Sequence, residues 1–174
     1  MFPKPDEKTL ALMKRLNRRD LAVWLATWFG LGYLKPAPGT WGSLGALPFS
    51  CVIVHFYGVE GLALATLILF GLGLWATARF EFLSQEKDSR MIVIDEVLGQ
   101  WIAVTPALLA PHWIAVSFLL FRAFDIFKPW PIAAIDRDMK TPLGVMADDI
   151  AAGLAAAVCL ILLQTGVRYA GFGL

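Results

Sequence analysis

Five carboxylates stand at the borders of long apolar segments, and they are the side chains of this sequence best suited to chemistry. They lie in three separate segments: Asp95 and Glu96, Asp125, and Asp148 and Asp149. An ionised group at the edge of a hydrocarbon environment is costly, so its presence in three segments predicts a shared cation or a proton path. Paired carboxylates favour a hard ion such as Mg²⁺, which commonly takes water and phosphate oxygens as further ligands.

Each acidic pair also has a simpler structural explanation. The dipole at a helix N-terminus would favour Asp95 and Glu96. Either Asp148 or Asp149 could cap the helix that the following apolar stretch predicts, and capping is compatible with metal binding. Neighbouring residues on a helix point about 100° apart. We therefore expect one of Asp95 and Glu96 to ligate an ion directly, and the other to support that ligand or to act as a base.

Three charged residues recur at every third position before a proline. Arg122, Asp125 and Lys128 stay near one helical face until Pro129 disrupts the helix. One explanation is a structural ion pair between Arg122 and Asp125. The additional charge of Lys128 favours a different one, a site for a phosphate beside a metal ion. The DxD spacing at residues 136–138 is interpreted as a solvated turn.

The segment KPAPGTWGS at residues 35–43 could hold a phosphate. Its prolines restrict the chain, and its glycines allow close approach of the backbone. Amides at the start of the following helix, together with Lys35, Thr40 and Ser43, would supply the hydrogen-bond donors. Pro-Gly is equally an ordinary turn and Ser43 an ordinary helix cap, so both interpretations stay open.

The composition predicts a membrane protein. Hydrophobic residues make up 58% of the 174, charged residues only 17%, and the mean hydropathy is +0.65, which exceeds what soluble domains show. We expect an all-α, polytopic transmembrane helical bundle with spans near 44–57, 61–80, 96–110, 112–127 and 149–167. The apolar run 21–34 is expected as a short interfacial or re-entrant helix. A span there would move the 35–43 segment to the face opposite the carboxylates.

Basic residues are concentrated in a few strips. Fourteen of the 15 Lys and Arg residues lie in 1–35, 79–90 and 122–140, while the turns near 58–60 and 110–112 carry none. The positive-inside rule therefore places the strips, and the carboxylates with them, on the cytoplasmic face. We expect residues 1–20 to form a cytoplasmic interfacial segment and 21–174 a single membrane-embedded catalytic domain. No pattern typical of nucleic-acid binding occurs.

Four stretches together resemble the phosphatidylglycerophosphatase A family. They are KPAPGTWGS at 35–43, IDEVLG at 94–99, the segment 121–131, and DDIAAG at 148–153. They occur in the family's order, and the resemblance extends over about residues 20 to 165. It implies a bacterial inner-membrane, Mg²⁺-dependent lipid phosphatase, which hydrolyses phosphatidylglycerophosphate in the membrane to phosphatidylglycerol and phosphate.

The resemblance and the residue patterns lead to one hypothesis for the site. The expected metal ligands are Asp95, Glu96, Asp148 and Asp149. The expected catalytic residues are Asp95, Glu96, Asp125 and Asp149. The expected substrate-binding residues are Lys35, Thr40, Ser43, Arg122 and Lys128. Mg²⁺ would bridge the phosphate and lower the pKa of a bound water, while the basic residues and the loop neutralise the phosphate oxygens. Asp125 would ligate metal or orient Arg122, and an attacking aspartate is the alternative to an attacking water.

A small cation- or proton-coupled membrane transporter is the alternative function. A transporter needs carboxylates near the middle of the membrane and polar residues that continue to its far face. In this chain the outer halves of the expected helices are almost wholly apolar. The sequence therefore favours the phosphatase.

Overall fold

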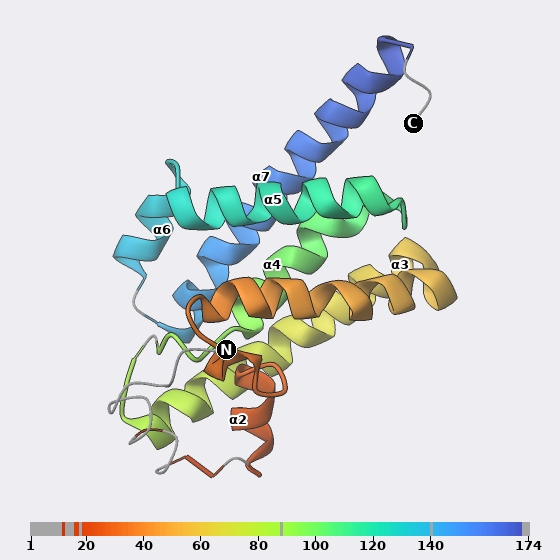
Figure 1. Ribbon diagram of the computed structural model, residues 1–174. Helices are drawn as coiled ribbons and strands as arrows, with labels where there is room; N and C mark the ends of the chain where they lie inside the picture. Colours follow the sequence, from red (N-terminus) through yellow and green to blue (C-terminus); the bar gives the residue numbers. More distant parts are fainter. Residues whose placement is uncertain (1–11, 13–15, 18, 88, 140, 172–174) are drawn as a thin grey trace.

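The structure, a computed structural model, describes residues 12, 16, 17, 19–87, 89–139 and 141–171, and all regular elements among them are helices (Figure 1). Most of the predicted interfacial segment 1–20 lies outside the described residues. The elements are α2 (Leu21–Ala26), the 3₁₀ helix η1 (Leu31–Tyr33), α3 (Pro38–Ser84), α4 (Ile94–Val104), the 3₁₀ helix η2 (Thr105–Ala107), α5 (Pro111–Phe127), α6 (Ile132–Asp138) and α7 (Pro142–Tyr169). The predicted all-α class is confirmed.

Helix α3 is a hairpin of two helical arms joined at Gly58. The backbone there leaves the helical region, with φ 67° and ψ −171°. Glycine adopts a positive φ at little cost because it has no Cβ. Figure 1 shows the first arm, in orange, running out to this turn and the second arm, in yellow to green, running back beside it. The two arms correspond to the predicted apolar runs 44–57 and 61–80, and the turn lies where the sequence predicts one.

Residues 21–34 form two short helical pieces, α2 and η1. Asp20 caps α2, since its Oδ1 accepts a hydrogen bond from the backbone N–H of Ala22 at 3.0 Å. Six helical residues extend about 9 Å, far less than the roughly 30 Å of a hydrocarbon core. Val23 is buried, while Leu21 and Trp24 remain exposed. The segment therefore contains only short helical pieces, and the interfacial or re-entrant helix expected there stays a prediction.

Helix α4 is the central element and packs against α3, α5 and α7. Nine of its 11 residues are buried. The indole N–H of Trp101 donates to the carbonyl oxygen of Ala46 at 3.0 Å and so ties α4 to the first arm of α3. The helix is shorter than the predicted span 96–110, because Pro106 has no N–H to continue the ladder and η2 follows. α4 is thus an interior helix whose first turn carries Asp95 and Glu96.

Two glycines let α4 and α7 approach closely. A Cβ on Gly99 would lie 2.6 Å from the carbonyl oxygen of Asp149, and a Cβ on Gly153 would overlap the backbone of Gly99. Small residues at such a contact allow two helix backbones to meet, as is common between helices in lipid. The contact sets the first turn of α4 against the acidic part of α7.

Long apolar surfaces cover the outside of the bundle. Helices α3 and α7 are long and apolar enough to cross a membrane, and most of each apolar window is exposed rather than packed inside the protein. Large exposed apolar side chains include Phe56, Leu67, Leu119, Val158 and Leu162. A continuous surface of this kind is unfavourable in water and suits contact with lipid. The fold thus agrees with the membrane protein that the composition indicates.

The glycine contact between α4 and α7 generates the first prediction. Gly153→Ala should lower the free energy of unfolding by about 1–3 kcal/mol, because the added methyl group has to push the two backbones apart. Gly166→Ala is the matched control on the same helix, since a Cβ there meets nothing within 4 Å. Thermal unfolding of both variants in detergent checks this. Equal stability of the two variants would contradict the close contact.

Candidate functional site

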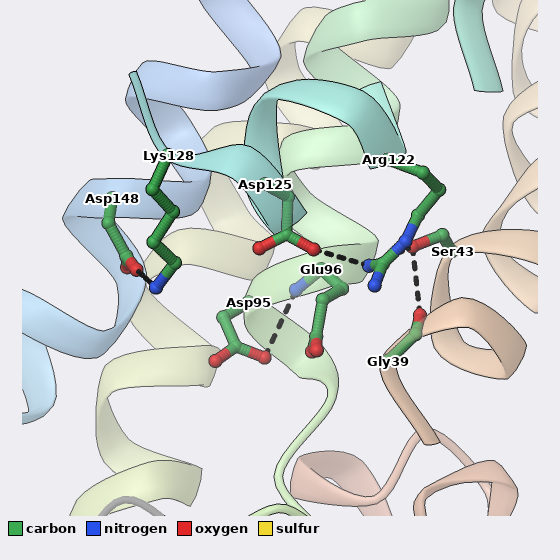
Figure 2. A network of polar contacts seen from close by, with 8 residues as sticks. All are labelled: Gly39, Ser43, Asp95, Glu96, Arg122, Asp125, Lys128 and Asp148. Atoms are coloured by element: carbon green, nitrogen blue, oxygen red, sulfur yellow. Dashed lines mark hydrogen bonds and ion pairs between the residues drawn. The ribbon is translucent and has the colours of Figure 1, made fainter. Parts of the chain in front are cut away.

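Three carboxylates from two helices meet at the start of α4. Asp95 and Glu96 come from its first turn and Asp149 from α7, and each offers an oxygen within 4.8 Å of the oxygens of the other two. The Oδ1 of Asp95 also accepts a hydrogen bond from the backbone N–H of Glu96 at 3.0 Å (Figure 2). The dipole of α4 favours negative charge at this position. We call these three residues the carboxylate cluster.

The carboxylate cluster fits a divalent cation. Asp95 and Asp149 are buried, and both Glu96 Oε2 and Asp149 Oδ1 are buried without a hydrogen-bond partner among the described residues. Buried anionic oxygens without partners are costly unless a cation or protons compensate them. Several carboxylate oxygens facing one point are the ligand type that Mg²⁺ takes. These three residues could therefore hold Mg²⁺.

A cavity of about 400 Å³ lies in front of the carboxylate cluster. Its walls come from both ends of α3, the α3–α4 loop, the first turn of α4, the end of α5, α6 and the beginning of α7. Seven carboxylates and four basic side chains line it. This volume falls within the range of small-ligand sites. Residues from all three predicted acidic segments thus face one space.

Lys128 joins three elements at the edge of the cavity. It ends α5, and its Nζ donates to Asp148 Oδ2 at 2.6 Å and to Asp136 Oδ1 at 2.7 Å. Burial alone would lower the pKa of the Lys128 ammonium, but the hydrogen bonds and charges of Asp136 and Asp148 outweigh it and raise this pKa above its usual value. Lys128 therefore stays protonated and links α5 to α6 and α7 through its two ion pairs.

Asp148 is turned away from the carboxylate cluster. Sequence reasoning grouped it with Asp149 as a metal ligand, whereas in the structure its Oδ2 faces Lys128 and only Asp149 joins the cluster. The reason is the roughly 100° between neighbouring helical residues. The same argument predicted unequal roles for Asp95 and Glu96, yet both offer an oxygen to the cluster.

Arg122 is held by contacts on both sides. Its Nη1 lies 2.6 Å from Asp125 Oδ2 and donates to Ser43 Oγ at 3.2 Å, while Ser43 Oγ donates to the carbonyl oxygen of Gly39 at 2.9 Å (Figure 2). The structure thus contains the Arg122–Asp125 ion pair that the sequence left as one alternative. Both side chains also line the cavity. In this arrangement Asp125 orients Arg122.

The 35–43 segment faces the cavity through its backbone. Ala37, Pro38 and Gly39 line the cavity, but Lys35, Thr40 and Ser43 are not among its lining residues. A Cβ on Gly39 would overlap the carboxylate of Glu96. This segment therefore packs against the carboxylate cluster and, through Ser43, positions Arg122. The phosphate-binding role of Lys35 and Thr40 stays a prediction.

Sequence reasoning missed several residues of the cavity. Asp136 was interpreted as part of a solvated turn, which is wrong, because α6 is a helix and brings this carboxylate to Lys128. Its neighbours Arg137 and Asp138 do pair with each other at the surface. Lys87 and Arg90 of the α3–α4 loop also line the cavity. Their only signal in the sequence is membership of a basic strip.

Fold and site together describe a helical protein with long apolar outer faces and a cavity lined by carboxylates and basic side chains. The model of the phosphatidylglycerophosphatase A family matches residues 24–164. The chain is 36% identical to phosphatidylglycerophosphatase A of Haemophilus influenzae over 154 residues, which cover 87% of this chain and 94% of that protein. This chain belongs to the phosphatidylglycerophosphatase A family and is a lipid phosphatase.

Two further relatives carry two different names. Phosphatidylglycerophosphatase A of Escherichia coli is 34% identical over 158 residues, which cover 90% of each chain. A Bacteroides thetaiotaomicron protein, provisionally named phosphatidylinositol-3-phosphatase, is 35% identical over 156 residues, which cover 80% of this chain and 91% of that protein. No solved structure matches this chain with significance.

The Lys128–Asp148 contact generates a prediction on stability. In a double-mutant cycle with Lys128→Met and Asp148→Asn, we expect a coupling free energy of about 1–2 kcal/mol, because the Asp148 side chain is only 8% exposed. Lys128 itself is partly exposed, which keeps the value below that of a fully buried pair. Arg137 and Asp138 form the matched surface pair, where we expect no measurable coupling. Chemical unfolding in detergent measures both cycles, and equal coupling would contradict the structural role of Lys128.

Proposed function

We propose that this protein hydrolyses the phosphomonoester of phosphatidylglycerophosphate to phosphatidylglycerol and phosphate, with Mg²⁺ as cofactor. The observation that carries the proposal is the carboxylate cluster, which faces a cavity with basic side chains in a member of a lipid phosphatase family. The names of the relatives support a phosphorylated phospholipid headgroup as the substrate class.

Asp95, Glu96 and Asp149 are the proposed holders of Mg²⁺. A bound Mg²⁺ supplies positive charge to the phosphate oxygens and makes a nearby water more acidic. The buried, unpartnered oxygens of Glu96 and Asp149 support this assignment. Asp148 leaves the proposed metal set, because its carboxylate faces Lys128.

Arg122 and Lys128 are proposed to orient the phosphomonoester. Both line the cavity, and both are held by carboxylates at 2.6 Å, so their positions are fixed before a substrate arrives. A preorganised cation next to a reacting phosphate stabilises the charge that develops in the transition state. Asp125 contributes by orienting Arg122. Ser43 also positions Arg122 through its hydrogen bond, and Gly39 packs against Glu96.

The cavity is proposed to lie at the cytoplasmic surface of the inner membrane, in a multi-pass protein. The basic strips 79–90 and 122–140 lie beside the cavity, and such strips are typical of the cytoplasmic side. Phe127 and Trp130 flank Lys128 and are 81% and 85% exposed. Aromatic side chains of this kind are frequent at the membrane–water boundary, where a lipid phosphate would lie.

The decisive experiment measures phosphate release from phosphatidylglycerophosphate in detergent micelles, with and without Mg²⁺. We expect release by the wild-type protein that requires Mg²⁺, and a loss of at least roughly 100-fold in Asp149→Asn and Asp95→Asn, since each removes a charged ligand. Asp138→Asn is the matched control, because this exposed carboxylate contacts only Arg137 in the described structure.

Three outcomes would count against the proposal in different ways. Full activity of Asp149→Asn with normal Mg²⁺ dependence would reject the carboxylate cluster as the metal site. Full activity after removal of all divalent cations would reject the cofactor. No release by the wild-type protein under any condition would favour the transporter, which proton or cation flux in proteoliposomes would then test.

A further inference from the structure

The four basic side chains that line the cavity fall into two sets. Arg122 and Lys128 are engaged by carboxylates within 2.7 Å. Lys87 and Arg90, on the α3–α4 loop, also line the cavity, but they form no ion pair or side-chain hydrogen bond with any described residue. An exposed cation without a partner keeps its full charge for a ligand. The α3–α4 loop is therefore the part of the cavity best able to attract a further anion.

Residues 89–93 of this loop are packed against the rest of the protein. Val93 is fully buried, and its backbone N–H donates to the carbonyl oxygen of Ala26 at 2.8 Å. Ile92 is buried as well, and its N–H donates to the carbonyl oxygen of Ser89 at 2.9 Å. A Cβ on Gly32 would overlap the carbonyl group of Met91, so η1 packs directly against the loop. This part of the loop, which carries Arg90, therefore has a defined backbone.

Apart from Glu81 at the end of α3, the carboxylates of the cavity lie on the side formed by α4, α5, α6 and α7, which is already assigned. The carboxylate cluster and Asp125, Asp136 and Asp148 lie on α4, α5, α6 and α7. An anion there requires compensation by a cation, as proposed for the phosphomonoester. A second anionic group on the same ligand would be repelled from that side and attracted to the loop. The charge distribution thus suits a ligand that carries two phosphate groups.

The substrate of the proposed function carries two chemically distinct phosphates on one headgroup. One is the terminal phosphomonoester, and the other is the phosphodiester that links the headgroup to diacylglycerol. We propose that Lys87 and Arg90 bind this phosphodiester while the phosphomonoester lies at the carboxylate cluster, an inference that rests on the proposed function. Binding of a remote, non-reacting group adds affinity for the whole substrate, so these residues would select lipids that carry a phosphodiester.

The test is kinetic and uses the double variant Lys87→Gln/Arg90→Gln in a non-ionic detergent. We expect KM for short-chain phosphatidylglycerophosphate to rise roughly five- to tenfold, because two charged contacts to the substrate are lost. The value of kcat should change less than about twofold, since the groups at the reacting phosphate stay in place. Arg137→Gln, which removes a basic residue outside the cavity, is the control and should leave KM unchanged.

Two inhibitors separate the phosphodiester site from general attraction of anions. Phosphatidylglycerol keeps the phosphodiester but lacks the phosphomonoester, so its inhibition constant should rise together with KM in the double variant. Inorganic phosphate has no phosphodiester, so its inhibition constant should stay the same. An equal rise for both inhibitors would overturn the proposal in favour of unspecific electrostatic attraction. Unchanged KM would overturn it outright.

The outcome is separable from that of the proposed function. If the wild-type protein does not hydrolyse phosphatidylglycerophosphate, the proposed function fails, and binding of short-chain phosphatidylglycerol measured by calorimetry still tests the loop. Weaker binding to the double variant than to wild type and Arg137→Gln would support a phosphodiester site. Equal binding to all three proteins would reject it. Circular dichroism and the single variants Lys87→Gln and Arg90→Gln show whether folding is intact.

Discussion

The close backbone contact between α4 and α7 is the constraint on which the rest of the site depends. Gly99 and Gly153 have no side chain to keep the helices apart, so the first turn of α4 meets α7 next to Asp149. Three carboxylates that repel one another are thereby forced together in a largely buried place. Packing energy spread over the apolar bundle can hold such a group, but only a cation or protons can compensate its charge. In the proposed function, this tight helix contact is what would give the carboxylate cluster its affinity for Mg²⁺.

The basic side chains around the cluster fall into two groups, one with a structural role and one suited to binding a ligand. A cation already paired with one or two carboxylates contributes little net charge at a distance, but its position is well defined. Arg122 links α5 to α3 through Ser43, and Lys128 links α5 to α6 and α7. Together they fix the positions of the helices that form the walls of the cavity. Lys87 and Arg90 are the reverse case, with full charge and fewer restraints, and such groups suit recognition of a ligand rather than support of the fold.

The sequence predicts the fold class and the main acidic residues because both depend on local patterns. Long apolar runs require helices, and Gly58 lies where the turn between two runs is expected. The assignment of Asp148 could not be settled in the same way, because adjacent carboxylates look equivalent until the rotation of α7 is known. Asp136 escaped notice because α6 is a short helix and nothing in its local sequence indicates the contact with Lys128. The role of Ser43 depends likewise on a contact 79 positions away.

The charged cavity and the apolar helix faces lie in different parts of the protein, which explains why the site suits a lipid. Figure 1 shows the beginnings of α3 and α7, the end of α5 and α6 gathered toward one side of the bundle, while α7 continues well beyond it to the other. Six of the charged groups of the cavity belong to the first of these regions, and the others come from the end of α3, the α3–α4 loop and the first turn of α4. A headgroup could enter there with its phosphates in a polar environment while its acyl chains stay beside the exposed apolar faces of the helices. A soluble phosphate ester would gain nothing from those faces. The arrangement therefore favours substrates whose phosphate is anchored at a membrane surface.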